Sequence, residues 1–179
     1  MDVAKLTISQ KKALSVFTAE ADRFETAVAR LTKRELDYSA ANGDWTIRQI
    51  VHHLVDGNNL WLFFLNRAIA TPGTTMRLEG FPGNEAWAEG LAFHKRPIQA
   101  VLALITAQHR FLAEAAAYFA DAWDQYVVFI DAEGKEAQRM SAGQIINMLS
   151  EHLAEHVATI ETIKKQCKAQ RELDERLYL

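Results

Sequence analysis

WTIRQIVHHLVDGNNLW, residues 45–61, carries the clearest helix signal in the chain. Thr46 can accept a hydrogen bond from the backbone of Gln49 and Gln49 can return one, which makes a capping box. Trp45, immediately before the cap, adds a hydrophobic staple. We therefore predict that a long helix begins after Thr46, and that it ends near the Pro-Gly pair at 72–73.

Three further segments space their apolar side chains three and four residues apart, which is typical of helices with one buried face. They cover about residues 9–31, residues 97–119 and the chain from Ser141 onward, where Gln144 completes a second capping box. The charged tail after Lys164 is expected to extend the last helix past the body of the protein. Four long amphipathic helices predict an all-α fold, a four-helix bundle.

Two connections depart from the helical pattern. Residues 71–96 form a long crossover between the second and third predicted helices, and its aromatic residues predict that it packs down as a cover. Residues 123–140 contain the β-prone run YVVFI followed by the turn residues DAEG. This order predicts a short hairpin before the fourth helix.

The composition excludes several classes of protein. The chain has 179 residues, 49% of them hydrophobic and 24% charged, which suits one soluble globular domain over residues 1–179. A net charge of −3 without a clustered basic face argues against nucleic-acid binding. No apolar run approaches the roughly 18 residues of a membrane span, and the N-terminus has no signal core. The single cysteine, Cys167 in the polar tail, fits a reducing, cytoplasmic location.

The orientation of the histidines on their helices distinguishes surface positions from inner ones. Successive helical residues turn by roughly 100°, so His53 lies roughly 60° from Ile50, on the inner face. The neighbouring His52 lies roughly 160° away and is expected on the solvent side. His152 and His156 are four residues apart and therefore stack on one face of the fourth helix.

Two imidazoles one turn apart can reach one metal ion, and metal sites in bundles are built from facing helices. A single inward histidine is more often a core residue, and a lone pair at this spacing is a weak signal. Three inward histidines on two helices favour a metal, because burying three imidazoles without partners is costly. We therefore predict one divalent transition metal held by His53, His152 and His156.

The string HLAEH, residues 152–156, also matches a zinc-protease pattern. We reject this interpretation, because such enzymes need another acidic ligand well downstream and little chain follows His156. We therefore predict that Glu155 is a solvated charge on the flank of the helix.

Three other side chains have open roles. His109 lies on the apolar stripe of the third helix and either lines a pocket or, as we favour, is a hydrogen-bonded core residue. Asp56, three residues after His53, either orients an imidazole or is an exposed acid. His94 lies in the crossover without a supporting pattern.

Several of these segments resemble one family. Residues 45–61 resemble the helix start and first-ligand segment of the DinB/YfiT-like bundle proteins, and EHLAEHVATI, residues 151–160, resembles their closing segment. EAWAEG (85–90) and FIDAEG (129–134) are similar to the YfiT-like branch, so the resemblance covers about residues 45–165.

The resemblance implies a four-helix bundle, often dimeric, with a three-histidine site for nickel, zinc or a similar ion. Carried over by motif, the ligands are His53, His152 and His156. Many YfiT-like members are richer in histidine around the closing motif, where this chain has Ala154, Glu155 and Thr159. Some relatives are S-transferases or isomerases that use a low-molecular-weight thiol, and others are described only as hydrolases by inference.

Three histidines leave positions on a metal open for water or substrate, and a metal lowers the pKa of a bound water or thiol. Together with the resemblance, this implies a metal-dependent enzyme with thiol S-transferase-like chemistry, in which zinc or nickel activates a bound thiol or water toward a small-molecule substrate and a low-molecular-weight thiol is the further cofactor. Metal-assisted hydrolysis is the first alternative, and a non-catalytic, stress-associated metal-binding bundle is the second. A homodimer is expected from the resemblance, without nucleic acid or membrane as a partner.

Overall fold

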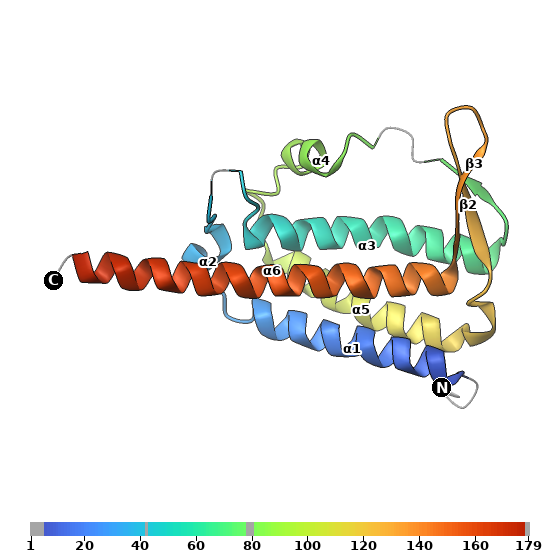
Figure 1. Ribbon diagram of the computed structural model, residues 1–179, viewed down its shortest axis with the longest axis horizontal. Coiled ribbons are helices and arrows are strands. Elements are labelled where there is room, and N and C mark those ends of the chain that lie inside the picture. The colour runs from blue at the N-terminus through green and yellow to red at the C-terminus, as the bar shows by residue number, and fades with distance from the viewer. Residues whose placement is uncertain (1–5, 42, 78–80, 178–179) are drawn as a thin grey trace.

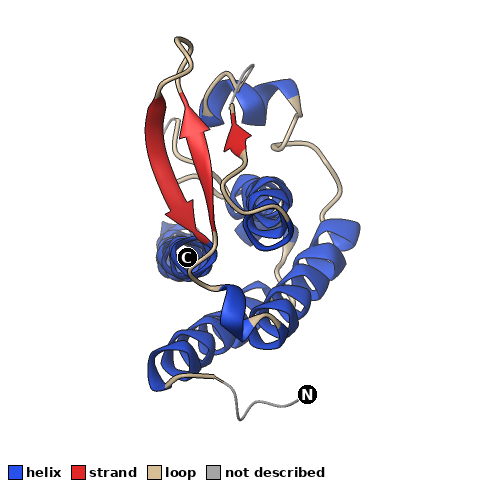
Figure 2. Ribbon diagram, turned by 90° about the vertical axis from the view of Figure 1, so that its right-hand side faces the viewer, coloured by secondary structure: helices blue, strands red, loops and turns tan. Residues whose placement is uncertain are grey.

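The computed structural model describes residues 6–41, 43–77 and 81–177, and four long helices dominate it (Figure 1). Within the bundle, α1 and α3 each pack against both α5 and α6. Seen from one end, the long helices surround a common interior, and the strands and α4 lie beyond α3 and α6 (Figure 2). The predicted four-helix bundle is confirmed, with helices α1 (Ile8–Val28), α3 (Ile47–Ala70), α5 (Gln99–Tyr118) and α6 (Ala142–Leu177).

The capping signals begin the helices as expected. Gln49 N–H donates to Thr46 Oγ1 at 3.3 Å and Thr46 N–H donates to Gln49 Oε1 at 3.0 Å, so that α3 starts at Ile47. Ser141 and Gln144 form the same reciprocal pair at the start of α6, with distances of 2.8 and 3.1 Å. Both capping boxes satisfy backbone donors that a helix start would otherwise leave without partners.

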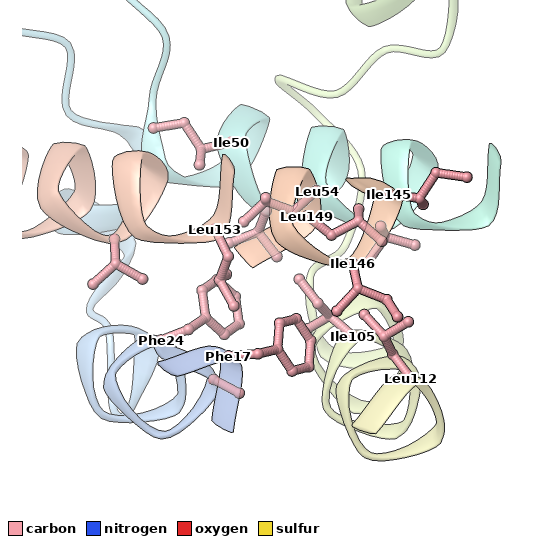
Figure 3. Close-up of a cluster of buried hydrophobic side chains, with 14 of the residues drawn as sticks. Phe17, Phe24, Ile50, Leu54, Ile105, Leu112, Ile145, Ile146, Leu149 and Leu153 are labelled. Atoms are coloured by element: carbon pink, nitrogen blue, oxygen red, sulfur yellow. The ribbon is translucent and has the colours of Figure 1, made fainter. Parts of the chain in front are cut away.

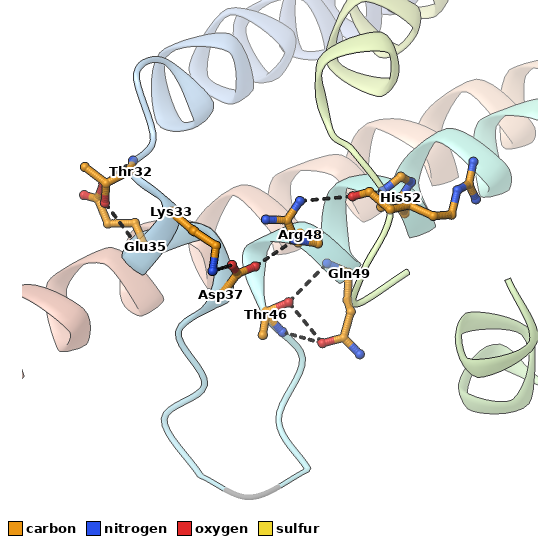
Figure 4. Close-up of polar contacts among 9 residues, drawn as sticks. Thr32, Lys33, Glu35, Asp37, Thr46, Arg48, Gln49 and His52 are labelled. Atoms are coloured by element: carbon orange, nitrogen blue, oxygen red, sulfur yellow. Dashed lines mark hydrogen bonds and ion pairs between the residues drawn. The ribbon is translucent and has the colours of Figure 1, made fainter. Parts of the chain in front are cut away.

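Helix α1 is shorter than predicted because a third capping box interrupts the chain. Thr32 and Glu35 exchange hydrogen bonds and begin the short helix α2 (Lys33–Asp37), as Figure 4 shows. Helix α1 therefore ends at Val28 rather than near residue 31.

The predicted hairpin before the fourth helix is confirmed. It consists of β2 (Tyr126–Ile130) and β3 (Glu136–Ser141), paired antiparallel. The strand β1 (Thr75–Met76) pairs parallel to β2 and completes a small sheet of order β1-β2-β3, which the all-α prediction did not include. The crossover expected as loop thus contains β1 and the helix α4 (Asn84–Gly90), and a 3-10 turn, η2 (Ala120–Ala122), follows α5.

The core lies between the four long helices and consists mainly of side chains from their inward stripes (Figure 3), with further members from α2 and the β2–β3 hairpin. Burial of this apolar surface, rather than helix propensity, supplies most of the stability of such helices. The largest fully buried side chains of the described residues are Phe17, Phe24, Phe64, Phe93, Ile47, Ile50, Leu54, Leu65, Ile105, Ile145, Ile146 and Ile160.

Helix α6 extends past the bundle at its C-terminal end, as the charged tail predicted (Figure 1). The expectation that Cys167 lies in a polar tail was wrong: it is 3% exposed. Helix α2 packs against α6, and Arg34 pairs with Asp174 at 2.6 Å, so the core side of α6 stays covered beyond the main bundle. Within the described ranges, no helix is long and apolar enough to cross a membrane.

Candidate metal centre

Two facing helices bring three histidines together. His53 comes from α3, and His152 and His156 come from adjacent turns of α6, which packs against α3. Nε2 of His152 lies 3.1 Å from Nε2 of His53 and 3.1 Å from Nε2 of His156. All three ligand atoms lie within 4.8 Å of one another. The structure thus assembles the three residues that the helical arithmetic selected.

These spacings fit a metal centre. Zinc binds imidazole nitrogen at about 2.0–2.1 Å, so two nitrogens on one tetrahedral ion lie about 3.3 Å apart. The two 3.1 Å separations are close to this value. A neutral imidazole has a lone pair to offer an ion, and three nitrogen donors suit several divalent transition metals.

The surroundings favour the neutral, metal-binding form of these histidines. Burial, followed by the charge of the neighbouring His152, lowers the pKa of His53 to about 4. Burial, followed by the charges of its two histidine neighbours, lowers the pKa of His156 to about 3, and burial also lowers the pKa of His152. Because the charged form is the one disfavoured, the cluster is neutral at neutral pH.

One aromatic residue connects this cluster to the crossover. The indole of Trp45 meets the His53 ring edge-on, with ring centroids 5.1 Å apart. Its Nε1–H donates a 3.0 Å hydrogen bond to Glu85 at the start of α4. The crossover therefore lies beside the histidines as a cover, as its aromatic content predicted.

A cavity of about 520 Å³ adjoins the histidines, and we call it the chamber. Its volume is within the range of small-molecule sites, about 300–1,000 Å³, and its walls are largely apolar, as in such sites. No hydroxyl, thiol or amine side chain occurs among its described lining residues. These residues are His53, Asp56, Gly57, Leu60, Trp61, Phe63, Phe64, Met76, Arg77, Phe81, Asn84, Trp87, Met148 and His152.

Asp56 lines the chamber but does not orient an imidazole. Its Oδ2 is buried and has no hydrogen-bond partner among the described residues. The sequence left two roles open for Asp56, and the structure supports neither: the carboxylate makes no hydrogen bond to an imidazole, and it is not fully exposed to solvent.

The prediction that His52 faces solvent was wrong. His52 is 2% exposed, stacks on Phe93 with ring centroids 5.5 Å apart, and donates to the carbonyl oxygen of Arg96 at 3.4 Å. Arg48, which is paired with Asp37 at 2.7 Å, also donates to this carbonyl at 3.0 Å (Figure 4). The end of the crossover returns over this flank of α3 and buries what would otherwise be a surface position.

The remaining histidines lie away from the chamber. His109 is 4% exposed and is a core residue, as favoured, but its Nδ1 has no hydrogen-bond partner among the described residues. His94 is exposed, and so is Glu155, as its flank position predicted. Sequence reasoning missed the chamber wall of Phe63, Met148 and Trp87, because only the meeting of α3, α4 and α6 makes these residues neighbours. The aromatic residues of the crossover were the one signal that could have indicated it.

Comparison with known proteins identifies a matching family. The sequence profile of the DinB superfamily matches residues 17–160. A protein of Oceanobacillus iheyensis is 34% identical over 87 residues, which span 48% of each chain. A protein of Bacillus pumilus is 31% identical over 63% of this chain and 67% of its own length. A protein of Bacillus cereus is 26% identical over 78% of this chain and 76% of its own length. All three are named metal-dependent hydrolases by inference.

Two solved structures share the fold. YfiT from Bacillus subtilis, described as a metal-dependent hydrolase by inference with an unusual four-helix bundle topology, superposes with a TM-score of 0.72 at 21% identity over 90% of both chains. The mycothiol-dependent maleylpyruvate isomerase gives a TM-score of 0.55 at 17% identity, over 88% of this chain and 62% of its own. At these identities the similarity concerns the fold alone.

Proposed function

The chain belongs to the DinB superfamily, and on that premise we propose that it is a metal-dependent S-transferase. In this proposal His53, His152 and His156 hold one zinc or nickel ion, and a low-molecular-weight thiol is transferred to a small molecule in the chamber. A bound divalent ion lowers the pKa of a thiol or water and so supplies a nucleophile near neutral pH.

The composition of the chamber carries this proposal. His53 and His152 are part of its wall, yet none of its described residues is a serine, threonine, tyrosine, cysteine or lysine that could attack a substrate. The buried Cys167 lies elsewhere on α6 and is not among the lining residues. The attacking group therefore has to enter from outside, as a small thiol or as water.

The apolar walls favour a thiol over water. Aromatic and methionine side chains exclude water and hold an organic substrate beside the histidines. The mycothiol-dependent isomerase that shares this fold gives independent support for thiol chemistry.

Hydrolysis is the second candidate. It is supported by the names of the three bacterial relatives, all of which are called metal-dependent hydrolases by inference. A non-catalytic metal-binding bundle would be expected to have a closed site, whereas here a chamber adjoins the histidines. The homodimer and the cytoplasmic location stay predictions, and sedimentation analysis of the purified chain would test the former.

Metal content is the decisive measurement, made by elemental analysis of protein purified without an affinity tag. We expect about one ion per chain in the native protein, as one three-histidine site requires, and its loss in His53→Ala and His156→Ala. The matched control is His94→Ala, which removes an exposed histidine outside the cluster and should leave the metal in place. A native chain that takes up neither zinc nor nickel would overturn the proposal.

The two reactions differ in what they consume. An S-transferase removes free thiol in the presence of an electrophile, whereas a hydrolase cleaves its substrate with no thiol added. Assays of the metal-loaded protein with both kinds of substrate separate the candidates, and in either case His156→Ala should abolish turnover.

A further inference from the structure

We propose that the chamber binds an uncharged aromatic compound with a hydrogen-bond donor, and that Asp56 accepts this hydrogen bond and disfavours anions. Naming this compound as the substrate rests on the function proposed above. The binding preference itself rests on the chamber walls and on one carboxylate, and it does not require a metal.

Two pairs of aromatic rings line the chamber, one from α3 and one from the crossover. Trp61 and Phe64 of α3 lie with ring centroids 5.5 Å apart. Phe81, just before α4, and Trp87, within α4, lie with ring centroids 5.7 Å apart. Large parts of several rings stay uncovered: Phe63 is 51% exposed and Trp87 is 39% exposed. Contiguous exposed apolar surface within a concave site is typical of ligand binding, and aromatic rings prefer other rings as partners.

Asp56 supplies the polar contact. Its Oδ2 is buried without a partner among the described residues, whereas buried polar atoms in native proteins nearly always have one. Asp56 also lines the chamber, so a hydroxyl or N–H group on a compound there would meet the accessible part of this carboxylate. An anion in the same place would meet a carboxylate in a partly desolvated site, where repulsion between like charges is strong.

Besides Asp56, the described wall of the chamber includes one positively charged side chain, Arg77. Arg77 is exposed, and its guanidinium reaches the turn of the β2–β3 hairpin, where a Cβ on Gly134 would lie 3.6 Å from Nη2. His53 and His152 are the remaining titratable groups of the described wall. Asp56 is therefore the one negatively charged side chain among the described residues that line the chamber.

The test uses two fluorescent probes that share one ring skeleton. N-phenylnaphthylamine is neutral and carries an N–H donor, and anilinonaphthalene sulfonate adds a negative charge to it. Dissociation constants are measured by fluorescence titration of the full chain after treatment with a chelator. The measurement is repeated in His156→Ala, whose altered residue does not line the chamber, to exclude direct contact between probe and metal.

The neutral probe is expected to bind about tenfold more tightly than the sulfonate, the scale of repulsion between two like charges in a partly desolvated site, since both probes carry the same N–H donor. Asp56→Asn should narrow this ratio to about threefold or less, because the amide lacks the negative charge. The matched control is Glu114→Gln, an exposed carboxylate on α5, which should leave the ratio unchanged. Trp87→Ala and Phe63→Ala should weaken binding of the neutral probe, while Tyr118→Ala, 74% exposed and outside the chamber wall, should not.

Equal affinity for the two probes, or a ratio that Asp56→Asn leaves unchanged, would overturn the inference. Binding that survives both wall variants would overturn it as well, since the probe would then lie elsewhere. Because the titration uses metal-free protein, a chain that fails to bind metal can still show the preference, and a metal-binding chain can lack it.

Discussion

Replacing His109 with leucine should make the fold less sensitive to acid. His109 lies inside the bundle on α5, 4% exposed, with the rings of Phe17 and Phe24 edge-on at 5.6 and 5.7 Å. Its Nδ1 finds no hydrogen-bond partner among the described residues. Burial lowers the pKa of His109 from 6.5 to about 4, because the charged imidazolium would lose its hydration.

The sign and size of the effect follow from this pKa. The unfolded chain takes up a proton at His109 below about pH 6.5, whereas the folded chain does so only near pH 4. The stability that the fold has with His109 buried in its neutral form is therefore fully present above pH 6.5, and by about pH 4 it has been lost. At about 1.4 kcal/mol for each pKa unit, the loss amounts to about 3 kcal/mol.

The assay is urea unfolding followed by circular dichroism, at about pH 7.5 and about pH 4.5, with a chelator present throughout. The three histidines of the candidate metal centre titrate in both proteins, so their contribution cancels in the comparison. The wild-type chain should lose about 2–3 kcal/mol more stability between these pH values than His109→Leu does. At the higher pH the variant should be at least as stable, because leucine fills the site without an unpartnered nitrogen. Equal losses in the two proteins would refute the reasoning.

Two further predictions concern the helices that position the site. Thr46→Ala removes the side chain that caps α3 through Gln49, and it should lower the free energy of unfolding by about 1 kcal/mol in a urea titration. Gly143→Ala would place a Cβ 3.1 Å from the ring of Trp123 and 3.4 Å from its carbonyl oxygen, so it should lower the melting temperature. Gly90→Ala, with no atom within 4 Å of the new Cβ, is the matched control and should melt at or above the wild-type temperature. A Gly143→Ala protein that melts with the control would contradict the crowding at Trp123.

Local signals predicted the parts of the fold that depend on near neighbours in the chain. The capping boxes at Thr46 and Ser141 involve residues three apart, so the sequence alone locates the helix starts. Helix α2, which the periodicity did not predict, has the same kind of signal in Thr32 and Glu35 but is only five residues long, too short for an amphipathic repeat.

The errors come from contacts between distant segments. His52 is oriented away from the inner stripe of α3, but a helical projection does not tell that Phe93 and Arg96 return to cover it. Cys167 looked solvated among charged neighbours, and the packing of α2 against α6 buries it. In both cases the covering segment lies far away in the sequence.

In the candidate metal centre too, local sequence signals predicted one part of the geometry and contacts between distant segments decided the other. The spacing of His152 and His156, and the inward position of His53, follow from the geometry of single helices and were readable from the sequence. Their 3.1 Å separations, the chamber beside them and the partnerless oxygen of Asp56 arise where α3, α4 and α6 meet. Helical periodicity sets the direction in which a side chain points, whereas the distance between helices depends on how side chains from the whole core interlock.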